Sequence, residues 1–338
     1  MKVNNQIIKE NYAIYEGDCM SVLPSIPNES VDMSAYSPPF ESLYTYSSDA
    51  RDFSNCDTRE QFLTQYDYLI KEMARVTKKG RINAIHITEI VESNGSSFDL
   101  PNEVIRLHSK NGFDYKGRIT IWKEPLKVRI RTMVQSLMHK FVVEDTTKCF
   151  PAQPDYLLLF KKRGEVETPV THDFGLTHYA GDVPILPNMI AAYNNANKTN
   201  YTTAELWEHL TEKYKDWKDP KTNKLSHYIW QRYASSVWDD VRAGNVLPFR
   251  DAKQEDDEKH VTPTQLDVLD RCIDLWTNEG ETVLTPFAGV GSEVYSAVSM
   301  GRKAIGIELK SSYFKQMIKN VEFAERRFEQ TQKQSKLF

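Results

Sequence analysis

The sequence predicts an α/β fold with a mostly parallel sheet and helices on both of its faces. Two observations carry this prediction. Short apolar runs typical of buried strands alternate with amphipathic stretches typical of helices along most of the 338 residues. Near the C-terminal end, the apolar run 282–284 enters a glycine-containing turn at 285–292, and a helix-like stretch follows. This strand–turn–helix order is how parallel sheets are built.

The N-terminal half supplies most of the expected elements. Apolar runs predict strands at 12–15, 31–36, 81–88, 118–122 and 156–160. Helical spacing of apolar residues predicts helices at 19–26, 58–76 and 102–109. Strands and helices therefore alternate from the first strand to about residue 163.

This alternation stops between residues 164 and 235, which are rich in Asn, Thr, His and aromatic residues. We interpret this stretch as a variable, inserted region between two halves of one domain, at 12–163 and 236–325. A helix at 264–278 and a strand at 304–307 resume the pattern. From about Glu322 the chain is polar, so we expect a helix end followed by a frayed terminus.

The composition excludes several classes of protein. Hydrophobic residues make up 40% of the chain and charged residues 27%, which is typical of a globular protein and not of a disordered one. No apolar run reaches the roughly 20 residues that span a membrane, and residues 1–11 lack an apolar signal core, so we expect a cytoplasmic protein. The four cysteines are far apart in the sequence and form no CxxC pair, so no metal is expected.

Charge is distributed unevenly along the chain. The formal net charge is −4, yet the segment 116–163 contains 11 Lys/Arg and only 4 Asp/Glu. A basic face on an acidic protein is compatible with nucleic-acid binding, and an ordinary solvated surface explains the charges equally well.

The glycine turn has the features of a nucleotide-binding loop. Glycines let the backbone approach a ligand closely, and the helix that follows directs N–H groups at it. Glu308 ends the next strand, 17 residues after Gly291. An acid at about this spacing is placed to accept hydrogen bonds from ribose hydroxyls.

A second motif, Ser37-Pro38-Pro39-Phe40, follows the strand at 31–36. Two prolines fix the backbone and remove two N–H donors, which leaves rigid carbonyls free to accept hydrogen bonds. The Ser37 hydroxyl adds another acceptor, and Phe40 adds a flat apolar face. Together they suit a planar group that carries an NH₂. An ordinary proline turn is the alternative for such a tetrapeptide alone.

With both motifs, the chain resembles the DNA amino-methyltransferases that act on N4 of cytosine or N6 of adenine. That family pairs a (D/N/S)PP(Y/F) tetrapeptide with an FxGxG turn, which correspond here to 37–40 and 287–291. Further matching stretches lie at 17–32, 236–238, 260–263 and 301–308. The resemblance covers roughly 12–163 and 232–321, and it extends to members encoded by phages and other mobile elements.

The resemblance implies a permuted Rossmann-like fold in which the catalytic motif precedes the cofactor motif. The C-terminal strands would begin the sheet and the N-terminal strands complete it. We expect the strand ending at Glu308 to be followed by the strand that ends at Asp18, and that one by the strand that ends at Ser37. The loops after these strands would then share one crevice.

The resemblance also implies the cofactor, S-adenosylmethionine, and the residues that hold it. Glu308 would accept from the ribose hydroxyls and Asp18 from the adenine amino group, although Asp18 as a simple helix N-cap is a fair competitor. The other candidates flank these two in the predicted crevice: Thr262, Pro263, Thr285, Pro286, Phe287, Gly289, Gly291 and Ser292.

The resemblance implies double-stranded DNA as the partner and a role in restriction–modification. The protein would act as a monomer or a homodimer. Ser37 and the Pro38 carbonyl would accept from the amino group of a flipped base, and Phe40 would stack on it. Candidate phosphate contacts lie in the basic segment: Lys127, Arg129, Arg131 and Lys140. Region 164–235 would recognise the target, and 47–52 is placed to close over the base.

The chain departs from the family pattern at two positions, of which Ser37 bears on the target base. Thr285 stands where the family commonly has Asp, which removes one acceptor near the cofactor. In the family, Ser in place of Asp at the position of Ser37 is linked to methylation of N4 of cytosine. Similar members from mobile elements methylate adenine. Cytosine is therefore slightly favoured as the target base, and adenine is the alternative. Methylation of RNA or of another amino-bearing substrate, and a non-catalytic DNA-binding subunit, are the other functional classes considered.

Overall fold

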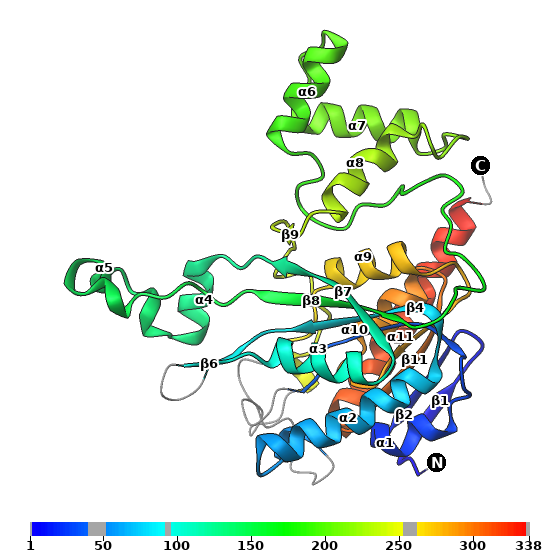
Figure 1. Ribbon diagram of the computed structural model, residues 1–338. Coiled ribbons are helices and arrows are strands. Elements are labelled where there is room, and N and C mark those ends of the chain that lie inside the picture. The colour runs from blue at the N-terminus through cyan, green and yellow to red at the C-terminus, as the bar shows by residue number, and fades with distance from the viewer. Residues whose placement is uncertain (1, 40–51, 92–95, 253–261, 336–338) are drawn as a thin grey trace.

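The computed structural model describes residues 2–39, 52–91, 96–252 and 262–335. A nine-stranded sheet forms its centre, with the strand order β1-β2-β11-β10-β3-β4-β8-β7-β9 (Figure 1). The predicted α/β fold with a mostly parallel sheet is confirmed. The strands of this sheet are β1 (Asn5–Ile8), β2 (Tyr12–Glu16), β3 (Val31–Tyr36), β4 (Thr77–Ile87), β7 (Phe113–Ile121), β8 (Asp155–Lys162), β9 (Val237–Trp238), β10 (Thr282–Thr285) and β11 (Lys303–Glu308). β5 (Ile90–Val91) and β6 (Ser97–Phe98) pair separately.

Both ends of the chain build the central part of the sheet, as the permuted order predicts. β2 pairs in parallel with β11, and β11 in parallel with β10. The prediction that β3 lies beside β2 was wrong. β3 pairs with β10, on the side of β10 opposite to β11. The chain crosses over β11 and β10 between β2 and β3, which places a topological switch point at β10. Ligands bind outside the carboxyl ends of the strands at such a point.

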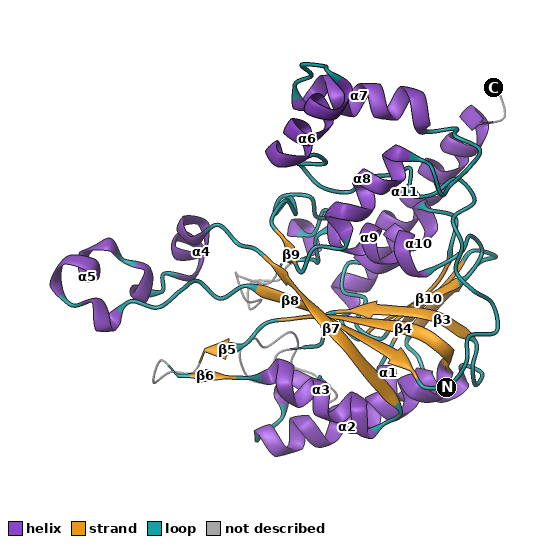
Figure 2. Cartoon of the chain, turned by 45° about the horizontal axis from the view of Figure 1, so that its top comes forward, coloured by secondary structure: helices purple, strands orange, loops and turns teal. Residues whose placement is uncertain are grey.

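Two layers of helices cover the sheet (Figure 2). On one face lie α1 (Cys19–Val22), α2 (Arg59–Val76) and α3 (Leu100–Lys110). On the other face lie α9 (Leu266–Trp276), α10 (Ser292–Ser299) and α11 (Ser311–Ser335). Strands that alternate with helices favour this arrangement, because crossovers between parallel strands are generally right-handed and pack their helices onto the faces of the sheet.

The two ends of the chain differ from the sequence-based expectation. The short β1, which was not predicted, pairs antiparallel with β2 at the edge of the sheet. The expected helix end near Glu322 was also wrong, since α11 continues to Ser335. Its buried side chains Phe314, Met317 and Val321 pack with α10 and β2, and this apolar face continues to Ala324. Packing of that face stabilises the helix beyond its polar sequence.

Region 164–235 contains three helices with an apolar cluster of their own: α6 (Pro187–Asn197), α7 (Thr203–Tyr214) and α8 (Lys224–Tyr233). It is attached to the sheet domain by apolar contacts, among them Leu275 of α9, and by a buried arginine. Arg271 of α9 is fully buried, donates to the Ala180 carbonyl oxygen at 2.7 Å and pairs with Asp240 at 2.8 Å. Such a pair fixes one orientation because an unpaired charge at this depth is costly.

Thr202→Ala is expected to lower the free energy of unfolding by about 1 kcal/mol. The Thr202 side chain caps α7 by accepting from the Glu205 N–H, and the Glu205 carboxylate accepts from Thr202 N at 2.8 Å. Urea denaturation measures the loss. Thr203→Ala, one residue further and exposed, is the matched control. Equal losses in both variants would contradict the capping role.

Candidate active site

A cavity of about 1820 Å³ opens at the carboxyl edge of the sheet. The segments that follow β2, β3, β4, β10 and β11 all contribute to its lining, so the loops predicted to converge do so. Sites for one small ligand usually measure about 300–1,000 Å³. The cavity therefore has room for a cofactor and part of a second ligand.

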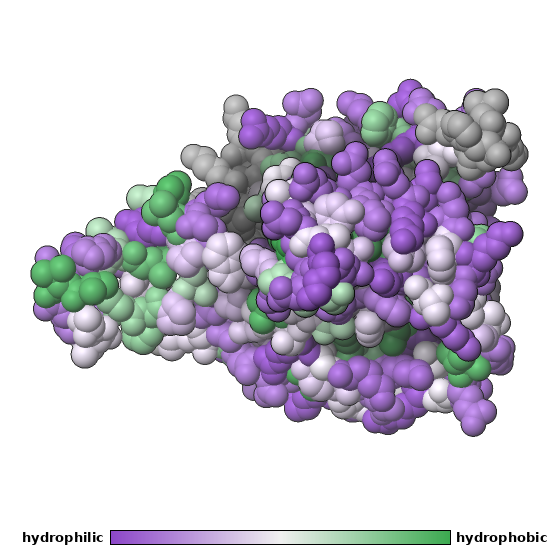
Figure 3. Space-filling model, turned by 90° about the horizontal axis from the view of Figure 1, so that it is seen from above, coloured by the Kyte–Doolittle hydropathy of each residue, from purple (hydrophilic) through white to green (hydrophobic). Residues whose placement is uncertain are grey.

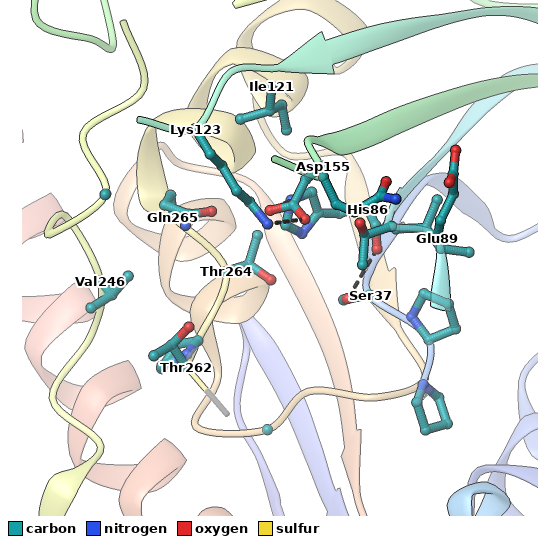
Figure 4. Close-up of a pocket in the computed structure, with 18 of the residues that line it drawn as sticks. Ser37, His86, Glu89, Ile121, Lys123, Asp155, Val246, Thr262, Thr264 and Gln265 are labelled. Carbon is teal, nitrogen blue, oxygen red and sulfur yellow. Dashed lines mark hydrogen bonds and ion pairs between the residues drawn. The ribbon is translucent and has the colours of Figure 1, made fainter. Parts of the chain in front are cut away.

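The tetrapeptide after β3 forms one wall of this cavity. Ser37, Pro38 and Pro39 line it, while Phe40 and residues 47–51 lie outside the described residues. The Ser37 hydroxyl donates to the backbone carbonyl oxygen of His86 at 2.9 Å (Figure 4). Because the hydroxyl hydrogen is used in this way, the oxygen lone pairs remain available to accept from a ligand.

Beside Ser37 lies an ionic cluster that sequence reasoning missed. His86 is the penultimate residue of β4, Asp155 begins β8 and Lys123 follows β7, and all three line the cavity (Figure 4). His86 Nε2 lies 3.4 Å from Asp155, and Lys123 pairs with the other carboxylate oxygen. Burial alone would raise the pKa of Asp155, but the hydrogen bonds and charges of His86 and Lys123 outweigh it and hold this pKa at about 2.

Glu308 binds the glycine turn from the next strand. Its carboxylate accepts from Gly289 N at 2.7 Å and from Lys310 N at 2.8 Å, and it lines the cavity. Burial raises the pKa of Glu308 to about 7, although the two N–H donors lower it. The predicted acid is therefore in contact with the predicted glycine turn.

Asp18 lines the same cavity and also caps a helix. Its carboxylate accepts from Met20 N and from the Ser21 hydroxyl, each at 3.0 Å, at the start of α1. The N-cap interpretation of Asp18 is thus confirmed. Its position in the cavity leaves the proposed contact with the cofactor open as well, because a carboxylate has about four acceptor sites.

The two glycines of the turn have different surroundings. Gly289 lines the cavity, and a Cβ atom built there meets no atom within 4 Å, so its backbone is open to a ligand. Gly291 has a φ of +89° and lies against α11, where a Cβ would come within 2.6 Å of Met317 Cγ. Gly291 and the buried Thr285 are absent from the cavity lining, and no described group bonds the Thr285 hydroxyl. Their effect on a ligand is therefore indirect.

The remaining predicted cofactor residues surround this opening. Phe287 contacts Tyr36 and Phe53 edge to face, with ring centroids 5.9 and 5.6 Å apart. The others that line the cavity are Thr262, Pro263, Pro286 and Ser292. An open glycine backbone beside a desolvated acid fits a ribose-containing cofactor such as S-adenosylmethionine.

The four predicted phosphate contacts lie on an arm between β7 and β8, formed by residues 123–154. It includes α4 (Pro125–Thr132) and α5 (His139–Glu144) and projects away from the sheet (Figures 1 and 2). Lys127 is the member of the four that lines the cavity. Arg129 and Arg131 lie on α4, and Lys140 on α5 lies 4.8 Å from the Phe141 ring centroid.

The described residues were searched for clusters of metal-binding side chains and for helices that could span a membrane. Within the described ranges, no group of three or more His, Cys, Asp or Glu side chains is arranged to hold a metal ion. Across the same residues, no helix is long and apolar enough to cross a membrane.

Comparisons with known proteins agree with this geometry. A family model described as DNA methylase, of the N6/N4 type, matches residues 31–319. The type II methyltransferase M.BglI of Bacillus subtilis is 27% identical over 94% of this chain and 88% of its own length. M.BamHI of Bacillus amyloliquefaciens is 25% identical over 91% of this chain, which spans 57% of that relative.

Among solved structures, a DNA modification methylase of Thermus thermophilus, TTHA0409, superposes with a TM-score of 0.56 at 18% identity. The superposition covers 95% of this chain and 96% of that one, and it shows a shared fold. Because the family match spans most of the sequence, the chain belongs to the N6/N4 DNA methylase family of S-adenosylmethionine-dependent methyltransferases.

Proposed function

We propose that this protein methylates the exocyclic amino group of a flipped base in double-stranded DNA, with N4 of cytosine favoured. The observation that carries the proposal is that Ser37 and the glycine turn at Gly289 open into one cavity. A base and a methyl donor are thereby brought together, which is the main requirement of a two-substrate transfer.

The chain's own residues supply position and hydrogen-bond acceptors. S-adenosylmethionine, when bound, supplies an activated methyl group on a sulfonium. The Ser37 oxygen and the Pro38 carbonyl oxygen accept the two amino hydrogens, which directs the nitrogen lone pair away from them and towards the donor. The same acceptors stabilise the positive charge that develops on nitrogen during transfer. The proton leaves after transfer, so no strong base is required to begin.

The target base is tested by identifying the product. The protein is incubated with labelled cofactor and duplex DNA, and the DNA is digested to nucleosides. N4-methylcytosine is the expected product, and N6-methyladenine would contradict the favoured base. Duplex DNA, RNA and free nucleotides compete in the same assay. Methyl transfer to RNA in preference to DNA would contradict the DNA substrate.

We further propose that the arm faces the DNA beside the cavity. It contains six Lys/Arg and three Asp/Glu on a chain of net charge −4. Apolar side chains are also exposed along it, among them Leu126, Ile130 and Val143 (Figure 3). Helices α6–α8 would complete the DNA-binding surface as the target-recognition region.

The double variant Lys127→Ala/Lys140→Ala is expected to weaken DNA binding without sequence preference. The slope of log K against log salt is negative and its magnitude shrinks by about 0.9 for each lost phosphate contact, so the slope becomes less steep by about 1.8. Fluorescence anisotropy over a salt series measures it. Lys315→Ala/Lys319→Ala on α11, which removes the same charge from another surface, is the control. Equal slopes in the two double variants would overturn the proposed role of the arm.

A further inference from the structure

Glu293 is a buried acid that has no part in the reaction derived above. It stands in the first turn of α10, and its side chain is 3% exposed although it lines the cavity. A carboxyl group buried to this extent ordinarily has ion-pair or hydrogen-bond partners. Among the described residues its hydrogen-bond partner is its own backbone N–H. Its remaining acceptor positions are therefore available to a ligand in the cavity.

The part of the cavity near the glycine turn is rich in acidic side chains. Four other charged side chains line the cavity near the glycine turn: Glu308 from β11, Lys310 beyond it, Asp18 after β2 and Asp52. Three of the four are acids, and Lys310 lies 4.6 Å from the Tyr313 ring centroid. Burial raises the pKa of Glu293 to about 8, and the nearby Glu308 contributes to the rise. In the free protein at neutral pH, Glu293 therefore holds a proton.

We infer that Glu293 binds the positively charged methionine end of S-adenosylmethionine as a carboxylate and releases its proton to solvent when the cofactor binds. A cation close to a carboxyl group favours the ionised form, so binding of the cofactor and loss of the proton are coupled. No covalent bond of the cofactor changes in this step. The inference rests on the proposed cofactor site and names a residue that the FxGxG motif does not include.

The coupling makes cofactor binding depend on pH. Below about pH 8, part of the binding free energy is used to ionise Glu293, so the affinity rises with pH by up to tenfold per unit. The α-ammonium of the cofactor loses its own proton near pH 8, so the informative window is pH 6.0 to 7.5. Glu308 titrates in the same window because its pKa is about 7, and it therefore needs a variant of its own.

Isothermal titration calorimetry on the 338-residue chain counts the protons that are released when the cofactor binds. S-adenosylmethionine is titrated at pH 7.0 in phosphate and in Tris, whose ionisation enthalpies differ, and the difference in heat gives the protons released. Wild type is expected to release about one proton more than Glu293→Gln, since a group with a pKa of about 8 is mostly protonated at pH 7. Glu308→Gln separates the contribution of Glu308. Glu325→Gln, at an ion pair with Lys9 far from the cavity, is the control.

A second ligand separates the two cations of the cofactor. S-adenosylhomocysteine keeps the ammonium and lacks the sulfonium. If it causes the same proton release, the ammonium is the partner of Glu293. If the proton release is lost, the sulfonium is the partner. Infrared difference spectra of wild type should show a protonated carboxyl band disappear on cofactor addition, which tests the inference without a variant. Equal proton release by wild type and Glu293→Gln would overturn it while leaving the site intact. Absence of any cofactor binding by wild type would instead overturn the site itself.

Discussion

Ser37→Ala is expected to lower kcat for methyl transfer about 10²- to 10³-fold, the usual effect of removing one hydrogen bond that forms to developing charge. The hydroxyl is fixed by its donation to the His86 carbonyl oxygen at 2.9 Å, so its lone pairs have a defined direction. Alanine removes the acceptor and leaves the two prolines in place. Affinity for S-adenosylmethionine should stay within about twofold of wild type, because the predicted cofactor contacts come from the glycine turn, Asp18 and Glu308, and Ser37 is not one of them.

Single-turnover transfer to duplex DNA and calorimetric titration of the cofactor measure the two effects separately. Ser25→Ala is the matched control, since the Ser25 hydroxyl also donates to a backbone carbonyl oxygen, that of Val22, outside the cavity. It should transfer methyl groups at the wild-type rate. Near-normal turnover by Ser37→Ala would show that the tetrapeptide is not the catalytic loop.

Gly291→Leu is expected to abolish cofactor binding, with a loss of affinity above about 100-fold. Two physical effects combine there. The φ of +89° is unfavourable for any residue with a side chain, and the new Cβ would lie 2.6 Å from Met317 Cγ on α11. Relief of the contact requires the Met317 side chain, α11 or the turn to move, and a movement of the turn displaces Gly289 from the Glu308 carboxylate that holds it.

Gly280→Leu separates strain from collision. Gly280 has a φ of +76°, but a Cβ built there meets no atom within 4 Å. This control should lose stability and keep its affinity for S-adenosylmethionine. The affinity is measured at a temperature where both variants remain folded, as judged by circular dichroism. Unchanged affinity in Gly291→Leu would place the cofactor elsewhere in the molecule.

Local patterns in the sequence were sufficient for most of the fold. The runs at 31–36 and 282–285 form strands that are buried on both faces, and the apolar residues in them are typical of such strands, although β3 also buries Asp32 and Ser34. The order and spacing of the motifs were likewise sufficient to predict which loops line the cavity. Tight turns after strands need glycine or proline, so the residues that shape the cavity are recognisable from their neighbours in the chain.

Contacts between distant segments could not be derived in this way. The position of β3 beside β10 depends on where the chain returns to the sheet after α1, and no local pattern in the sequence of β3 predicts it, although Asp32 of β3 accepts a hydrogen bond from Thr282 N of β10. The cluster of His86, Lys123 and Asp155 joins three strands, and each residue lies at or within two residues of a strand end. A polar residue at a strand end is common, so none of the three was recognisable alone.

The sequence by itself determined the class of fold, the two motifs and their order, because each depends on residues close together in the chain. Only the tertiary structure decided which of the predicted residues reach the cavity. Glu308 does so and binds the glycine turn, whereas Thr285 and Gly291 support it from outside. It also revealed Glu293 as a buried acid facing the same space. Burial and the proximity of charges are set by segments far apart in sequence, and those two quantities decide what an acid can do.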